Sequence, residues 1–270
     1  MPKTTDVPHE LREFNKVFEN ISYRHGWGDV FVDFIDYSVA CFLPAGALKV
    51  ADYLKKTYGK DYGFFKELFG EWLKAQHKQL NRGKMWYDAL GAFYEVIASS
   101  SKASHLGQFF TPPDVVDMLT MITSDKAREG GRQRIADPCS GSGRMLVSFH
   151  AHFPGNYCFA ADVDAICTKM TALNMMLHGC EGQAVCMNSL DPEDWRFGYN
   201  VNPWIREFGG LPHLARIEKE QCFQWRGFQQ DKEKYAQRKA QAAAAQKEAL
   251  TVVKPEPVMG KLLLINQSLN

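Results

Sequence analysis

The stretch that decides the fold class of this chain is Ile135-Ala136-Asp137-Pro138-Cys139-Ser140-Gly141-Ser142-Gly143-Arg144-Met145-Leu146. A short apolar run ends at Asp137, two glycines follow, and an apolar pattern of helical period then begins. This order predicts a strand, a tight turn and a helix, the first unit of a doubly wound α/β domain. The glycines would let the backbone approach a ligand closely, and the start of the helix offers N–H groups to an anionic group. Taken alone, the pattern fits a strand–helix turn without a ligand about equally well.

A second strand is predicted over Asn156–Asp164, with Asp162 near its carboxyl end. In nucleotide-binding sheets an acidic side chain about 20 residues beyond the glycine turn holds ribose hydroxyls. A dinucleotide fingerprint would require glycine or alanine at position 146, where this chain has Leu146. The sequence therefore favours a nucleotide-like ligand but disfavours a nicotinamide-dependent oxidoreductase.

A third strand is predicted over Gln183–Met187, followed by Asn188. Ligands of parallel sheets bind beyond the carboxyl ends of the strands. Asp137, Asp162 and Asn188 each stand at such an end, so we expect them to converge on one site. This expectation depends on the residues alone.

Two motifs then give the chain a resemblance to a known family. Gly107-Gln108-Phe109-Phe110-Thr111-Pro112 resembles GQ(F/Y)(F/Y)TP, and Asp137-Pro138-Cys139-Ser140-Gly141-Ser142-Gly143 resembles DPxxGSG. Both motifs are typical of N6-adenine DNA methyltransferases, in particular the modification subunits of type I restriction systems. Asp88-Ala89-Leu90-Gly91 and Tyr94-Glu95 resemble the last helix before these motifs, and the resemblance extends over residues 86–190.

The resemblance implies transfer of a methyl group from S-adenosylmethionine to adenine N6 in DNA, in a restriction-modification-like system with a separate sequence-reading subunit. Phe110 and Thr111 would close over the methionine end of the cofactor, Asp162 would hold the ribose and Asn188 the adenine. The cofactor-binding residues that the resemblance implies are Gln108, Phe109, Phe110, Thr111, Pro112, Asp137, Pro138, Cys139, Ser140, Gly141, Gly143, Asp162, Val163, Asn188, Ser189 and Leu190.

The motif that takes the target base is incomplete. The family has Asn/Asp-Pro-Pro-aromatic after its fourth strand, where the side-chain amide and a backbone carbonyl hold N6 and the ring stacks on a flipped base. The candidate in this chain is Asn202-Pro203-Trp204, which lacks one proline and follows Asn188 after only about a dozen residues. These three residues are the predicted catalytic group. The alternative is a degenerate homologue that binds cofactor or DNA as an accessory protein without catalysis.

The predicted architecture is a helical N-terminal domain over residues 1–104 and a methyltransferase-like domain over residues 105–270. The second domain would carry a Rossmann-like, incomplete S-adenosylmethionine-binding sheet, with further strands at Phe197–Val201 and Leu262–Ile265. A long charged helix is predicted near residues 214–250, because the sequence QAAAAQ within it has high helix propensity.

Composition narrows the remaining possibilities. The 270 residues carry a net charge of +1, so no overall basic field indicates nucleic acid, although Lys49–Lys84 is locally rich in lysine. Seven cysteines without a CxxC pair favour a reducing compartment, and no histidine stands at zinc-ligand spacing from Cys180 and Cys186. The apolar run Ser38–Val50 is short and contains Pro44, and no signal-peptide core is present. We expect a cytoplasmic protein without a metal site.

Overall fold

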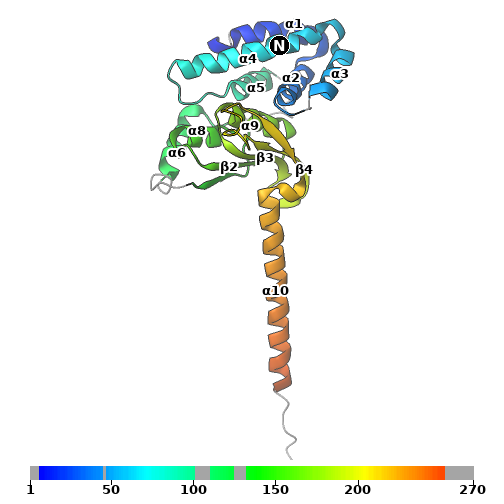
Figure 1. Cartoon of the computed structure of the whole chain (residues 1–270), viewed down its shortest axis with the longest axis vertical. Helices are drawn as coiled ribbons and strands as arrows, with labels where there is room; N and C mark the ends of the chain where they lie inside the picture. The colour runs from blue at the N-terminus through cyan, green and yellow to red at the C-terminus, as the bar shows by residue number, and fades with distance from the viewer. Residues whose placement is uncertain (1–5, 45–46, 101–109, 125–131, 253–270) are drawn as a thin grey trace, which may run out of the picture. The chain divides into compact units, whose positions relative to one another are not determined.

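A computed structural model of the chain describes residues 6–44, 47–100, 110–124 and 132–252. Helices and one five-stranded sheet build a mixed α/β structure (Figure 1). The helices are η1 His9–Leu11, α1 Arg12–His25, α2 Trp27–Cys41, α3 Ala47–Tyr58, η2 Gly59–Tyr62, α4 Gly63–Asn81, α5 Ala89–Ser100, α6 Pro113–Thr123, α8 Arg144–His152, α9 Ala165–Leu177, η4 Lys219–Gln221 and α10 Phe223–Val252. The strands are β1 Arg134–Asp137, β2 Tyr157–Asp162, β3 Glu181–Asn188, β4 Asp191–Val201 and β5 Leu214–Ile217.

The sheet has the order β1-β2-β3-β4-β5 and changes direction in the middle. Strands β1, β2 and β3 are parallel and are joined through α8 and α9, whereas β4 and β5 are antiparallel to their neighbours. The predicted α/β class is confirmed, but the expectation of a doubly wound parallel sheet is wrong for its second half. Only Ser189 and Leu190 separate β3 from β4. A parallel connection needs a dozen or more residues, so this short link permits only a hairpin.

The side chains of the sheet alternate between two apolar clusters. Cys158 and Ala160 of β2 belong to the main core, together with the buried side of α9 and the aromatic interior of the N-terminal helices. Phe159 and Ala161 belong to a smaller cluster on the other face, against which Trp225 packs. Helix α9 begins at the side chain of Asp164, which accepts hydrogen bonds from two backbone N–H groups of its first turn. The helices and the sheet therefore share one continuous core.

Residues up to Trp225 form one compact unit, and a second unit begins at Arg226. The domain boundary predicted at residue 104 falls in a segment outside the described residues and stays a prediction. The predicted strand Leu262–Ile265 also lies outside them. No helix in the described part of the chain has the length and apolar character needed to cross a membrane.

The long helix begins later than the sequence indicates. Leu214–Ile217, predicted to be its first turn, is instead strand β5, in which Leu214 pairs with Val201 and Ile217 with Gly198. Leu214 is fully buried in this position, so sheet pairing overrides the helical tendency of the charged sequence that follows. Helix α10 starts at Phe223 and, from Gln230 to Gln246, presents only exposed side chains.

Gly182 sits where β2 and β3 approach each other too closely for a side chain. A Cβ atom there would lie 1.8 Å from the backbone carbonyl oxygen of Cys158. We expect Gly182→Ala to lower the free energy of unfolding by about 3 kcal/mol, because the obstructing atom belongs to the backbone and cannot rotate away. Gly70→Ala in α4 is the control, since nothing lies within 4 Å of its added Cβ and alanine favours a helix. Urea unfolding of both variants measures the difference, and equal midpoints would contradict the expectation.

Candidate cofactor-binding site

The ends of three parallel strands form one edge of the sheet. Asp137 ends β1, Asp162 ends β2 and Asn188 ends β3. In the register, Asp137 lies opposite Ala160 and Asp162 opposite Cys186, so Asp162 stands two residues beyond the partner of Asp137, and Asn188 two residues beyond the partner of Asp162. The structure therefore places Asp137, Asp162 and Asn188 along the same edge, as the strand pattern predicts.

A backbone N–H of the glycine turn donates a hydrogen bond to the side chain of Asp162 and so positions the turn at this edge. Gly141 and Gly143 have φ angles of 55° and 88°, a conformation that few residues other than glycine adopt. The N–H of Gly141 donates to Asp162 Oδ2 at 2.8 Å, and the N–H of Asp164 donates to Asp162 Oδ1 at 2.8 Å. A Cβ atom on Gly141 would also lie 2.8 Å from the ring of Phe110. The two glycines are thus required by backbone geometry and by the approach of Phe110.

Beside the turn lies a cavity of about 410 Å³, within the range of pockets that hold small molecules. Seven of the residues implied by the resemblance line it: Phe110, Thr111, Asp137, Cys139, Ser140, Gly141 and Asp162. Ser142, Arg144 and Met145 join them, and none of these three was singled out as a binding residue from the sequence.

The other implied residues stand around the cavity or nearby. Ser189 Oγ donates to the Pro138 carbonyl at 2.8 Å, and the exposed Leu190 donates its N–H to Asn188 Oδ1 at 3.0 Å. Val163 is half exposed, and its carbonyl accepts a hydrogen bond from Arg196. Pro112 precedes α6, and Gly143 precedes α8. Gln108 and Phe109 lie outside the described residues.

The charges of the cavity suit a ligand with cationic groups and hydroxyls. Burial raises the pKa of Asp137, and the nearby charge of Asp162 raises it further, while the Cys139 N–H acts in the opposite direction. Arg144 is the one cation among the cavity residues given above, and Asp88 and Glu95 pair with it. S-adenosylmethionine carries a sulfonium, an ammonium and ribose hydroxyls, so its donors match the two carboxylates.

A buried hydroxyl without a hydrogen-bond partner among the described residues belongs to a tyrosine beside a wall of the cavity. Tyr94 Oη is buried and makes no hydrogen bond within the described part of the chain. Burial raises the pKa of Tyr94 to about 12, and the neighbouring Cys167, Asp164 and Asp162 contribute to the shift. The Tyr94 ring lies 5.5 Å from that of Phe110, a wall of the cavity. The site therefore fits a polar cofactor in volume, charge and hydrogen-bonding capacity. Among the described residues, no group of three or more His, Cys, Asp or Glu side chains is arranged to hold a metal ion.

The predicted catalytic group lies elsewhere. Because β4 runs antiparallel to β3, Val201 pairs with Gly182 and the following Asn202 stands at the opposite edge of the sheet from Asn188. Six residues of β3 separate Gly182 from Asn188, about 20 Å at 3.3 Å per residue. The structure thus does not bring Asn202, Pro203 and Trp204 to the cavity. The short spacing after Asn188 was the signal in the sequence for this reversal.

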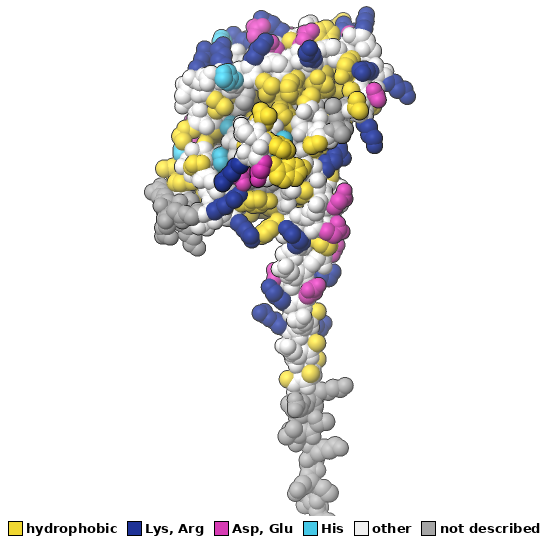
Figure 2. All heavy atoms as spheres, in the orientation of Figure 1, with side chains coloured by type: hydrophobic (Ala, Val, Ile, Leu, Met, Phe, Trp, Pro, Cys, Tyr) yellow, Lys and Arg dark blue, Asp and Glu magenta, His cyan; other side chains and the backbone are white. Residues whose placement is uncertain are grey.

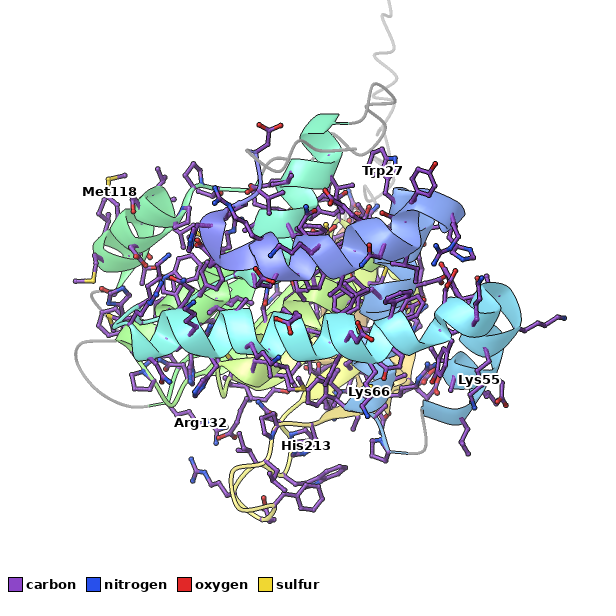
Figure 3. All side chains as sticks on the ribbon, turned by 90° about the horizontal axis from the view of Figure 1, so that it is seen from above. Trp27, Lys55, Lys66, Met118, Arg132 and His213 are labelled. Carbon is purple, nitrogen blue, oxygen red and sulfur yellow. The ribbon has the colours of Figure 1, made fainter. Side chains whose placement is uncertain are left out.

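Asn202 instead anchors the loop that joins β4 to β5. It is fully buried with a φ of 52°, and its side-chain amide donates to the carbonyls of Met176 at 3.0 Å and Cys180 at 2.9 Å. Its Oδ1 accepts the N–H of His213 at 3.0 Å, and the rings of Trp204 and His213 stack at 5.7 Å. Figure 3 shows His213 where this loop leaves the body of the molecule. Both amide N–H groups of Asn202 are thus used inside the protein, and the side chain is buried.

The part of the chain that contains the cavity is similar to a known protein family. Residues 85–199 match the family described as N-6 DNA Methylase. This segment of the chain is similar to the N-6 DNA methylase family. The match begins three residues before Asp88 and ends three residues before Asn202, so it contains the cavity and excludes the loop that Asn202 anchors.

The proteins to which this chain is similar are distant in sequence. A type I restriction enzyme methylase subunit (MjaVII) from Methanocaldococcus jannaschii is 26% identical over 115 residues, which are 40% of this chain and 19% of that protein. The match therefore accounts for about a fifth of the relative's length. A crystal structure of the type I restriction-modification system methyltransferase subunit from Streptococcus thermophilus aligns with 21% identity and a TM-score of 0.32, over 62% of this chain and 36% of that one. That score is too low to establish a common fold.

Asp88 is a residue whose role in the site was not predicted from the sequence. It is buried at the start of α5 and accepts four hydrogen bonds of 2.6–2.7 Å, from Ser142 Oγ, Arg144 Nε, Asn174 Nδ2 and the Gly91 N–H. Its carboxylate therefore connects α5, the glycine turn, α8 and α9. The available signal was Arg144, because a cation at the start of a buried helix requires a carboxylate partner.

Basic side chains gather on a different part of the molecule. Figure 2 shows lysine and arginine along the upper rim, over the N-terminal helices, and Figure 3 shows Lys55 and Lys66 pointing away from the molecule. Lys55 and Lys66 belong to the lysine-rich region Lys49–Lys84 of the sequence.

Proposed function

We propose that this chain binds S-adenosylmethionine at the edge formed by β1, β2 and β3 and serves in the methylation of adenine N6 in DNA. The observation that carries the proposal is the cavity between Asp137, Asp162 and the glycine turn, inside the segment that matches the N-6 DNA methylase family. Asp162 would accept from the ribose hydroxyls, Asn188 would meet the adenine, and Phe110 and Thr111 would cover the methionine end. The bound cofactor would supply a methyl group on a cationic sulfur.

The contribution of the chain's own residues would be binding and orientation. Methyl transfer to an amine requires the nucleophile in line with the methyl group, so holding the cofactor in one conformation provides much of the acceleration. The curated relative is named a subunit of a restriction enzyme, and we propose that this chain also acts with a separate sequence-reading subunit and with DNA. All seven cysteines lie in described segments and are free thiols, which suits the reducing cytoplasm.

A second candidate is a homologue that binds the cofactor but does not transfer its methyl group. The placement of Asn202 favours it, because both of its amide N–H groups donate inside the protein and the side chain is buried at the edge opposite the cavity. Under this candidate the chain would act as an accessory protein, and the group that holds the target adenine would be lacking or come from a partner.

Calorimetric titration of S-adenosylmethionine into the purified protein tests the shared step, binding. Transfer of a tritiated methyl group to adenine-containing DNA then separates the two candidates. Micromolar binding together with labelled N6-methyladenine supports the methyltransferase, and binding without label supports the accessory homologue. A folded protein that does not bind the cofactor contradicts both.

A further inference from the structure

A two-point clamp holds the Phe110–Thr111 segment against the glycine turn. These residues belong to no helix or strand, and α6 begins only at Pro113, so contacts with side chains position them. The Phe110 N–H donates to Glu95 Oε1 at 3.1 Å, and Arg144 Nη1 donates to the Thr111 carbonyl at 3.0 Å. Glu95 thus binds the N–H of Phe110, and Arg144 binds the carbonyl of the neighbouring Thr111.

The two clamping side chains also bind each other. Arg144 Nη1 and Nη2 donate to the two oxygens of Glu95 at 3.1 and 3.0 Å, a bidentate pair. Arg144 Nε donates to Asp88 at 2.7 Å, and the guanidinium lies 5.3 Å from the centre of the Phe110 ring. Only a planar fork of donors can reach two carboxylates and a carbonyl while stacking on a ring, which excludes lysine as an equivalent.

The charge of the clamp is stable within the protein. The Arg144 side chain is 6% exposed, and burial opposes its charge, but Asp88 and Glu95 outweigh this effect and raise the pKa of the guanidinium. Arg144 therefore stays charged at any physiological pH, and its own charge is largely neutralised by its partners. This leaves the carboxylates of Asp137 and Asp162 to determine the field felt by a ligand.

We propose that Glu95 and Arg144 are positioning residues that set the wall of the cofactor cavity over the methionine end of the ligand. This inference rests on the proposed function. Because Phe110 and Thr111 line the cavity, a fixed wall lowers the entropy lost when the cofactor binds. Because Glu95 belongs to α5, the clamp also couples the position of this helix to the shape of the cavity wall.

The test compares two ligands that differ only at the methionine end. S-adenosylmethionine and 5′-methylthioadenosine, which lacks the amino acid part, are titrated into the wild-type protein, Glu95→Gln and Glu71→Gln. Glu95→Gln spares Phe110, Thr111 and the pairing of Arg144 with Asp88, and the Glu95 side chain is 29% exposed, so the fold tolerates it. Glu71→Gln is the matched control, since it breaks an α4 ion pair with Lys74 at a side chain that is 25% exposed.

We expect Glu95→Gln to weaken S-adenosylmethionine binding about tenfold and to leave the affinity for 5′-methylthioadenosine within about twofold of the wild type. A less ordered wall increases the entropy lost on binding only for a ligand that contacts this wall. Glu71→Gln should change neither affinity. Arg144→Lys should give a larger loss with the same selectivity, but it disturbs a buried pair, so the conclusion depends on Glu95→Gln.

Equal loss of both ligands in Glu95→Gln, or loss of neither, would overturn the clamp while leaving the proposed function intact. Absence of S-adenosylmethionine binding in the wild-type protein would overturn the proposed function, and the positioning role with it. The two failures are therefore separated by the wild-type titration.

Discussion

Replacing Asp162 by alanine is expected to raise the Kd for S-adenosylmethionine about 100-fold. Asp162 is 9% exposed at the end of β2, and its two oxygens already orient the Gly141 and Asp164 N–H groups. The substitution removes both the carboxylate that would accept from the ribose and the acceptor that fixes the glycine turn. A 100-fold change in Kd corresponds to about 2.8 kcal/mol, within the range of about 1.5–3 kcal/mol that one hydrogen bond to a charged group contributes.

Calorimetric titration measures this change, and Asp194→Ala serves as the control. Asp194 is an exposed carboxylate of β4, 3.6 Å from Arg196, and plays no part in the turn. Asp162→Asn separates charge from shape, because the amide can accept one of the two backbone hydrogen bonds. If folded Asp162→Ala binds the cofactor within a few-fold of the wild type, the predicted ribose contact is wrong.

The second large effect is on stability. Asn202→Ala should lower the free energy of unfolding by about 3 kcal/mol, because it removes three hydrogen bonds in a buried place and leaves the His213 N–H without its acceptor. The positive φ of Asn202 adds to the cost, since alanine adopts it less readily than asparagine. Under the conditions in which the variant is folded, its affinity for S-adenosylmethionine should equal that of the wild type.

Denaturant unfolding and the same titration give the two readouts. Asn200→Ala is the matched control, because Asn200 lies two residues before Asn202. Its replacement removes one hydrogen bond with Gln183 and should lower the free energy of unfolding by about 1 kcal/mol. A variant at position 202 with unchanged stability but abolished methyl transfer would restore this asparagine to a catalytic role and refute the structural one.

The glycine turn and the three strand ends could be predicted because their signals are local. The apolar run before Asp137, the left-handed Gly141 and Gly143, and Gly179 after α9 each fix a conformation within a few residues. The convergence of Asp137, Asp162 and Asn188 then followed from the rule for parallel strands. The polar residues of the cavity could be predicted for the same reason, whereas its ligand stays a prediction.

The second half of the sheet could not be predicted in this way, because its direction depends on pairing. Gly198 and Asn200 disturb the pattern of a buried strand for reasons visible only in three dimensions. A Cβ on Gly198 would lie 2.6 Å from the ring of Trp195, and Asn200 accepts from Gln183 across the ladder. The partners of Arg144 were hidden for a related reason, since Asp88 and Glu95 are 56 and 49 residues distant in the sequence.

The hairpin of β3 and β4 has a consequence for the order in which the protein assembles. Its ladder closes across Ser189 and Leu190, and β5 adds to it after one further loop, so these contacts form at small cost in chain entropy and on the microsecond scale of hairpins. The contacts of Asp88 with Arg144 and Asn174 instead close stretches of 56 and 86 residues. We therefore expect the hairpin to form before the contacts of Asp88, although both lie almost entirely within the segment that matches the N-6 DNA methylase family.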